Sequence, residues 1–302
     1  MNIDKIDYQG WPNSYRISNG EVEAVITSDI GPRIMRYGFV DGQNFFKEFT
    51  GQLGKSGEPA WQPRGGHRVW IAPEDPVESY APDNGPVHID VAGDVLTATQ
   101  AVEPLTGIEK RITVKMEPSG TRVEVIHRLR NAGAGPRHLA PWALTMLAQS
   151  GVGIHGFPPR GTHPEMLAPT NPLVMWAFTD LGDPRWRLSR KYLALRQDPA
   201  ISSPQKLGSF HHHTWAAYLL NGELFVKRYQ AEGEPAGYPD YGCSFETFTN
   251  ADFLELETLG PLTMLRSGES ISHTERWTAH RGVGIGKWDD DELDRVLLPL
   301  IG

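Results

Sequence analysis

The sequence predicts an all-β protein built as a large antiparallel β-sandwich, and three observations support this fold class. The 302 residues include 32 Gly and 24 Pro, spread along the chain, a composition typical of many short strands joined by turns. Apolar and polar residues alternate with a period of two along most of the chain, as in strands with one buried face. Almost no helical pattern separates these segments, and parallel strands need long crossovers, so we expect antiparallel sheets.

The alternation predicts the strands in chain order. They cover residues 21–27, 33–38, 86–91, 94–101, 107–117, 121–131 and 138–148, and then 173–179, 213–220, 223–230, 244–249, 252–259 and 270–280. A Pro-rich irregular stretch is expected at 156–172. These strands favour a two-sheet sandwich over a propeller, because the chain has no repeat with a period of about forty to fifty residues.

Only the C-terminal tail has helical character. Asp289, Asp290 or Asp291 can cap a short helix that runs to Leu298, and acidic residues at a helix start interact favourably with its dipole. No linker divides the chain. We therefore expect one domain over residues 1–302, with this short helix at its end.

The composition is that of an acidic globular protein. Lys and Arg number 29 against 37 Asp and Glu, a net charge of −8, and 39% of the residues are hydrophobic. This apolar content suffices for a full core and excludes intrinsic disorder as the main description. The basic residues form no run longer than Arg190-Lys191. Since non-specific nucleic-acid affinity depends on clustered cations, we expect no nucleic-acid partner.

We expect a cytoplasmic protein with no membrane partner. The opening residues carry acids and lack the apolar run of a signal peptide, and no stretch approaches the roughly twenty apolar residues of a membrane span. The single cysteine, Cys243, cannot form an intrachain disulfide, which suits a reducing compartment.

Two glycine-rich motifs are not expected to bind a nucleotide. Residues 151–156 (GVGIHG) match the dinucleotide fingerprint, but Phe157, Pro158 and Pro159 follow, and the prolines exclude the first turn of a long helix. Residues 282–287 (GVGIGK) lack the Ser or Thr that follows the Lys of a phosphate loop. We therefore expect no cofactor.

The segment 65–74 (GGHRVWIAPE) is the first candidate for a binding site. It enters a strand through two glycines, which permit a close approach of the backbone to another group. In a strand, His67 and Val69 point one way while Arg68 and Trp70 point the other. A guanidinium that donates to hydroxyls beside an indole that covers an apolar ring suits sugar recognition. The alternative is a core Trp with an Arg that extends past it.

The segment 253–259 (FLELETL) is the strongest candidate for a catalytic site. Alternation places Glu255 and Glu257 on one face, and a sandwich strand seldom buries Glu without a partner. The two residues are roughly 7 Å apart along the strand. Because both lie on one strand, they cannot easily flank a scissile glycosidic bond, which favours one Glu as a base over a hydrolytic pair. The alternative is that both carboxylates have structural partners.

Several segments resemble the galactose-mutarotase-like proteins, which include the aldose 1-epimerases. The similarity lies in residues 256–258 (LET), 265–269 (LRSGE) before the strand that contains Trp277, and 30–34 (IGPRI). The segments GGHRVWIAPE, APWALTML, YPDYG and FLELETLGPL are similar to one branch of these proteins, and together they cover most of the chain in order. The resemblance implies a β-supersandwich with an open cleft for a small-molecule carbohydrate. It further implies a mutarotase-like or epimerase-like isomerase with Glu257 as the base and Arg68 on the sugar hydroxyls.

One departure from the family bears on the mechanism. Where the family has its catalytic His, this chain has 140–144 (APWAL), in which Trp142 offers a stacking surface and no imidazole is present. Mutarotation needs an acid at the ring oxygen as well as a base at the anomeric hydroxyl. Either His67 or another group supplies the acid, or the protein binds sugars without catalysis, or it is a lyase or hydrolase with a second catalytic group across the sugar from Glu257.

Four further residues are candidates for substrate binding: Asp240, Glu246, Lys227 and His213. Asp240 can accept from sugar hydroxyls, and Lys227 can neutralise an acidic substrate, although a turn residue and a solvated Lys are the simpler alternatives. His211 and His213 share a strand side, but the third ligand of a metal site is missing nearby, so we expect no metal.

Overall fold

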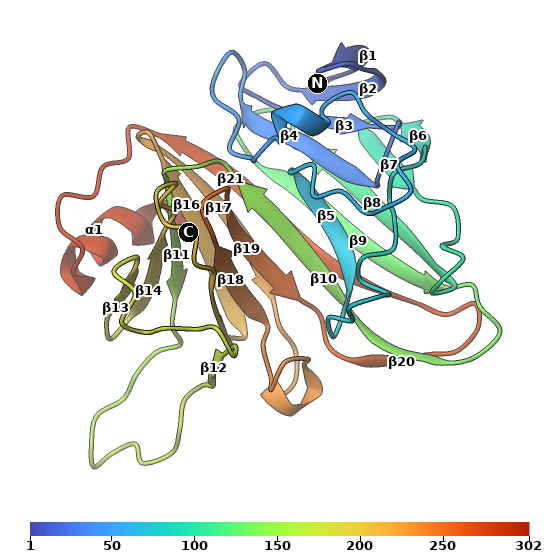
Figure 1. Ribbon diagram of the computed structural model, residues 1–302. Helices are drawn as coiled ribbons and strands as arrows, with labels where there is room; N and C mark the ends of the chain where they lie inside the picture. The colour runs from blue at the N-terminus through green and yellow to red at the C-terminus, as the bar shows by residue number, and fades with distance from the viewer. Residues whose placement is uncertain (302) are drawn as a thin grey trace.

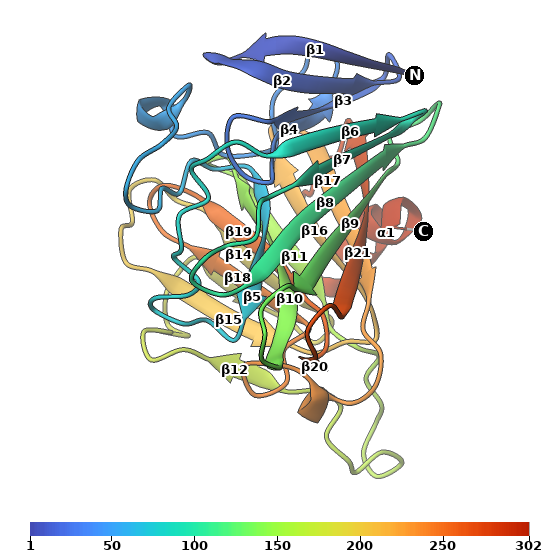
Figure 2. The same ribbon diagram turned by 90° about the vertical axis from the view of Figure 1, so that its right-hand side faces the viewer.

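The computed structural model describes residues 1–301, and Gly302, the last residue of the expected domain, lies outside them. Two large antiparallel sheets pack face to face, as Figures 1 and 2 show, which confirms the predicted β-sandwich. The first sheet has eleven strands, in the order β1 (Asn2–Tyr8), β2 (Trp11–Ser18), β3 (Val22–Thr27), β4 (Arg33–Phe39), β5 (His67–Ala72), β10 (Arg137–Leu147), β19 (Leu254–Leu259), β18 (Phe245–Thr249), β15 (Gln205–Ser209) and β12 (Leu173–Met175), with β20 (Thr263–Leu265) paired to β10.

The second sheet has ten strands. Their order is β13 (Trp186–Leu188), β14 (Tyr192–Arg196), β11 (Val152–Gly156), β16 (His213–Leu220), β17 (Glu223–Gln230), β21 (Ser270–Arg281), β9 (Val123–Asn131), β8 (Ile108–Met116), β7 (Val95–Thr99) and β6 (His88–Ala92). Two short 3-10 turns, η1 (Thr50–Gln52) and η2 (Pro235–Gly237), interrupt the loops.

The main core lies between the sheets. Alternate residues of each strand point inward, and an aromatic cluster joins the two layers: the Trp277 ring of β21 lies 5.5 Å from Phe46 and from Tyr37, and Phe225 of β17 lies 5.6 Å from both Tyr37 and Trp277. Edge-to-face and tilted contacts of this kind stabilise aromatic pairs beyond the area that they bury.

The C-terminal helix α1 (Asp290–Ile301) confirms the helical tail and is longer than expected. The Asp289 carboxylate accepts a hydrogen bond of 2.9 Å from the backbone N–H of Glu292, as an N-cap does. Leu293, Leu297 and Ile301 pack on the outer face of the second sheet, beside β14 and β16 in Figure 1. No helix within residues 1–301 is long and apolar enough to cross a membrane.

Seven strands were not predicted: β1, β2, β11, β13, β14, β15 and β20. The edge strand β1 is largely exposed on both faces, and β15 is buried on both, so neither shows alternation. β11 lies within the 151–156 motif (GVGIHG), which the sequence analysis considered only as a nucleotide site. The expected strand at 173–179 ends at Met175, because Thr179 closes a turn by hydrogen bonds with Trp176.

Candidate functional site

The outer face of the first sheet, away from the second, carries a cleft centred on β19. The strand register aligns side chains of this face in two rows across the sheet. One row runs through Arg68, Leu144, Glu257 and Glu246, and the next runs through Met146, Glu255, Phe248 and Lys206. The sheet thus brings together charged residues from four strands, β5, β15, β18 and β19, of which only β18 and β19 are adjacent in sequence.

The cleft has a volume of about 410 Å³ and is largely aromatic. Its lining residues are Trp61, Pro63, Arg68, Trp70, Glu74, Tyr80, Trp142, Leu144, Met146, Trp176, Phe178, Lys206, Phe248, Phe253 and Glu255. Loops form the walls: Trp61 and Tyr80 pack against Trp70 on the β5 side, while Trp176 lies over Lys206 on the β15 side. A concave apolar site with a few charged groups is the usual form of a small-molecule site.

Arg68 lies on the cleft floor and has hydrogen-bond donors that are not paired. Its guanidinium stacks 4.4 Å from the Trp70 ring centroid and 5.5 Å from that of Trp61, and Nη2 lies 3.4 Å from Glu255 Oε1. The residue is 2% exposed, and its Nε and Nη1 have no hydrogen-bond partner within residues 1–301. Unpaired buried donors cost free energy, so these N–H groups are suited to a ligand that supplies acceptors.

Lys206 is a site residue that the sequence analysis missed. Its Nζ lies 2.8 Å from Glu246 Oε2 and 3.0 Å from Glu257 Oε2, and it also stacks over the rings of Trp142 and Trp176 at 4.9 and 4.7 Å. Burial alone would lower the pKa of Lys206, but the two carboxylates outweigh burial and raise it. Lys206 therefore carries a fixed positive charge at the cleft.

The two glutamates of β19 differ in their access to the cleft. Glu257 is fully buried and does not line the cleft, because its Oε2 accepts hydrogen bonds from Trp142 Nε1 at 2.9 Å and from Lys206 at 3.0 Å. Glu255 is 7% exposed and does line it. Burial raises the pKa of Glu255 to about 7; the charge of Arg68 opposes this shift and that of Glu257 adds to it. Glu255 is therefore the cleft-facing carboxyl that can exchange a proton near neutral pH.

Glu246 and Asp240 form an acidic cluster with Glu257 around Lys206, and neither of the two lines the cleft. Burial raises the pKa of Glu246 well above its ordinary value; Lys206 opposes this shift, whereas Glu257 and Asp240 add to it. Burial likewise raises the pKa of Asp240, against a hydrogen bond with Glu246 and the charge of Lys206. One ammonium does not balance these neighbouring carboxylates, and their mutual repulsion favours the protonated forms of Glu246 and Asp240.

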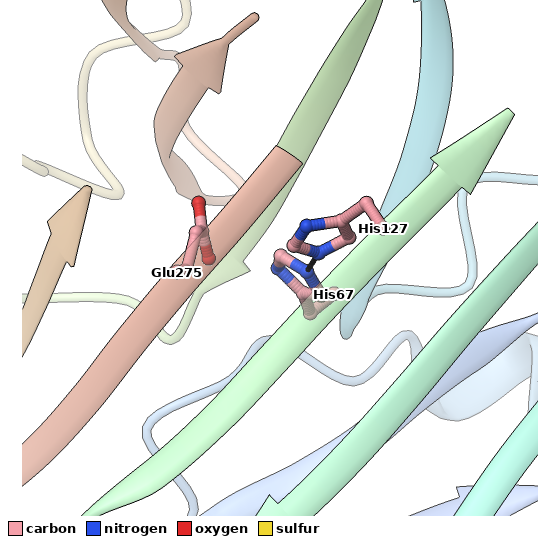
Figure 3. Close-up of side chains that lie close together, drawn as sticks. All are labelled: His67, His127 and Glu275. Atoms are coloured by element: carbon pink, nitrogen blue, oxygen red, sulfur yellow. Dashed lines mark hydrogen bonds between the residues drawn. The ribbon is translucent and has the colours of Figure 1, made fainter. Parts of the chain in front are cut away.

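His67 and Lys227 do not reach the cleft. Both side chains are fully buried and are not among the residues that line the cleft. Figure 3 shows His67 beside His127 and Glu275, which lie on strands of the second sheet. His67 Nε2 lies 2.6 Å from His127 Nε2, and Lys227 Nζ lies 2.8 Å from Glu275 Oε1. Burial lowers the pKa of His67 well below its usual range and so disfavours the protonated imidazole that the role of an acid, considered from the sequence, would require.

Three buried side chains of the kinds that bind metal ions lie close together: His67, His127 and Glu275. Their ligand atoms lie within 4.8 Å of one another. Two imidazole nitrogens on one tetrahedral ion are roughly 3.3 Å apart, given metal–nitrogen bonds of about 2.0–2.1 Å. The observed 2.6 Å fits a hydrogen bond instead, and the Glu275 carboxylate already accepts from Lys227 and Trp277. The cluster is therefore a hydrogen-bonded network.

The remaining expected residues divide between the cleft and other surfaces. Trp70 and Trp142 line the cleft but are mostly buried, and cations cover their rings, so the more exposed Trp61, Tyr80 and Phe178 offer the accessible aromatic surface. The exposed His213 lies in a separate groove outside the cleft.

Comparisons with known proteins agree with this architecture. No protein-family model and no curated protein matches the chain. A galactose mutarotase-like protein from Lactobacillus casei is 11% identical with a TM-score of 0.57, over 89% of this chain and all of that one. A galactose mutarotase related enzyme from Lactobacillus acidophilus is 10% identical with a TM-score of 0.56, over 89% and 98% of the two chains. A candidate aldose 1-epimerase from Klebsiella pneumoniae is 11% identical with a TM-score of 0.57, over 98% and 86%.

These likenesses show that the chain has the galactose-mutarotase-like fold, as the sequence motifs indicated. Fold alone does not carry over chemistry, because one fold supports many functions. The function must therefore be argued from the cleft.

Proposed function

We propose that the protein binds a sugar or sugar derivative in the cleft and interconverts its forms by mutarotase-like proton transfer. The observation that carries this proposal is Glu255, a cleft-lining carboxyl whose pKa is raised to about 7, beside the unpaired donors of Arg68. A base performs best when its pKa is near the working pH. The aromatic walls supply the apolar surface that covers one face of a pyranose ring.

We assign the roles as follows. Glu255 takes the proton of the anomeric hydroxyl, so that the ring bond to the anomeric carbon breaks as the carbonyl forms. Lys206, which also lines the cleft, donates a hydrogen bond to the ring oxygen as negative charge develops there. After the carbonyl group rotates, the same oxygen attacks the other face of the carbonyl carbon, and Glu255 returns the proton to the new anomeric hydroxyl. Glu257, the base that the sequence predicted, lies one layer behind and compensates the charge of Lys206. Arg68 orients the sugar through its hydroxyls.

The test is anomer exchange measured by NMR on a panel of freshly dissolved aldoses. We expect the wild-type protein to exceed the buffer rate for at least one sugar and Glu255→Gln to return that rate to the buffer value. Glu124→Gln, on β9 of the second sheet in a partly exposed ion pair with Arg276, is the matched control and should retain the wild-type rate. Equal rates for buffer, wild type and both variants would contradict the proposal.

A second candidate function is non-catalytic sugar binding. The observation that favours it is that the cleft lining, within residues 1–301, includes no imidazole to act as the acid. A ligand that binds the native state raises its melting temperature. A melting-temperature rise with a sugar that shows no exchange above buffer would favour this binding function over catalysis.

A further inference from the structure

A second polar cluster lies directly behind the cleft, between the two sheets. We call it the inter-sheet network; it consists of His67, His127, Thr145, Lys227, Thr258, His273 and Glu275. All seven residues are 5% exposed or less. A hydrophobic core could fill this space, and an isolated buried ion pair gives little net stability, so the presence of charge here needs an explanation.

The network bonds to β19 on both sides of Glu257. Lys227 Nζ donates to the Leu256 carbonyl at 3.0 Å while it pairs with Glu275 at 2.8 Å. The Thr258 hydroxyl donates to Glu275 Oε1 at 2.5 Å and lies 2.7 Å from His273 Nε2. Leu256 separates Glu255 from Glu257, and Thr258 follows Glu257. The segment that carries both carboxylates is thus held from behind by side-chain hydrogen bonds, in addition to its ladder bonds.

The proton positions in the network follow from its acceptors. A carbonyl only accepts, so His127 Nδ1 donates to the His273 carbonyl at 3.0 Å, which leaves His127 Nε2 to accept from His67 Nε2 at 2.6 Å. His67 Nδ1 then accepts from the Thr145 hydroxyl at 2.8 Å. Thr145 lies on β10 between two cleft-facing residues, Leu144 and Met146. The network therefore ties β5, β10 and β19, the strands of the cleft floor, to the second sheet.

We infer that Lys227 and Glu275 are positioning residues, a buried ion pair that holds the backbone of β19 and thereby sets the placement of Glu255 in the cleft and of Glu257 behind it. This inference rests on the proposed function, because the placement of Glu255 affects activity only if Glu255 is the base. The two residues touch no ligand; they act through the Leu256 carbonyl and the Thr258 side chain.

The test is the double variant Lys227→Met/Glu275→Gln, which removes both charges together. The Trp142 indole donates to Glu257, so its ¹⁵N NMR resonance, identified by its loss in Trp142→Phe, reports the placement of β19 whether or not a sugar binds. We expect this resonance to move, the titration midpoint of Glu255 to shift by on the order of 0.5 pH unit, and sugar affinity to fall roughly three- to tenfold.

The matched control is Lys110→Met/Glu103→Gln, another buried Lys–Glu pair of 2.8 Å, which has no contact with β19. It should leave the resonance, the midpoint and the affinity unchanged. Wild-type values for all three in the Lys227/Glu275 double variant would overturn the inference.

Two further outcomes need a separate interpretation: a double variant that does not fold, and a wild-type protein that binds no sugar of the panel. If the double variant does not fold, Thr258→Val removes one arm of the network from β19 with little change of shape, and the same readouts decide the inference. If the wild-type protein binds no sugar of the panel, the proposed function fails, whereas the resonance and the midpoint still test the positioning role.

Discussion

The two sides of β19 are lined by charged side chains that differ in their hydrogen bonding. On the cleft side, two nitrogens of Arg68, Nε and Nη1, have no hydrogen-bond partner within residues 1–301. On the inner face, Lys227 and Glu275 are each bonded to more than one group. Unpaired buried donors cost free energy, and those of Arg68 border a cleft in which a ligand can supply acceptors. The protein itself supplies the partners of Lys227 and Glu275 on the inner side.

Glu255→Gln should give the largest effect on the cleft side. Loss of a general base typically slows a reaction by about 10²- to 10⁴-fold, and the substitution removes no partner from the inner face. We expect that loss in the anomer exchange rate, with unfolding in urea unchanged or shifted to higher urea. A parallel loss of stability and activity would mean that the cleft and its support are not separate.

Lys227→Met should give the largest effect on the inner side. The substitution leaves the fully buried Glu275 without its cation, which costs about 3–5 kcal/mol of unfolding free energy for pairs of this type. Urea denaturation measures the loss. Lys115→Met on the exposed face of β8 is the control and should stay within about 0.5 kcal/mol of wild type. A loss below about 1 kcal/mol at position 227 would show that the ion pair is not supporting the sheet.

Arg68→Lys tests the cleft side of β19 without removing the positive charge at position 68. Lysine keeps the cation but loses the planar fork and the two unpaired nitrogens, so we expect sugar affinity to fall about tenfold while the fold is retained. Isothermal titration with the sugar found by the exchange assay measures this. Arg130→Lys, in a surface ion pair with Glu109, serves as the control. Unchanged affinity at position 68 would remove Arg68 from the binding site.

The pH dependence of stability should have opposite signs on the two faces. Burial raises the pKa of Glu255 from 4.5 to about 7, so the folded protein holds a proton that the unfolded chain has released. The corresponding stability is present at low pH and is lost as the pH rises through this window. The unfolding free energy of wild type relative to Glu255→Gln should therefore fall by on the order of 1 kcal/mol between about pH 4.5 and 7.

The inner face behaves in the reverse sense. Burial lowers the pKa values of His67 and His127, so the unfolded chain binds protons that the folded state excludes, and stability is lost as the pH falls below about 6.5. This acid-side loss should persist in Glu255→Gln. Urea midpoints for both proteins over this pH range provide the test, and a slope that disappears with Glu255 would contradict the assignment.

The sequence predicted which residues share a strand face more reliably than where that face points. Arg68 lies with Trp70, Glu255 with Glu257, and Lys227 with inward-facing neighbours, as alternation requires. Nothing in the alternation distinguishes a face between the sheets from a face in the cleft, because every residue of β19 and the residues 224–227 of β17 are buried on both faces. This is why Lys227 was expected in the cleft.

Lys206 illustrates a second reason why sequence analysis can miss a site residue. It lies on β15, where all five residues are buried and no alternation is visible, and its carboxylate partners come from two neighbouring strands. Such a residue becomes recognisable only when the order β19-β18-β15 is known. The fold class, by contrast, followed from turn composition and period, which are local properties of the chain.

The central claim is that Glu255 is the reactive carboxyl of a sugar-binding cleft. The most direct measurement is the ¹³C NMR titration of the Glu255 carboxyl, identified by its loss in Glu255→Gln, with and without the sugars of the panel. The account predicts a midpoint of about 7 that moves when a sugar binds. A midpoint near the ordinary glutamate value of about 4.3, unaffected by every sugar, would contradict it.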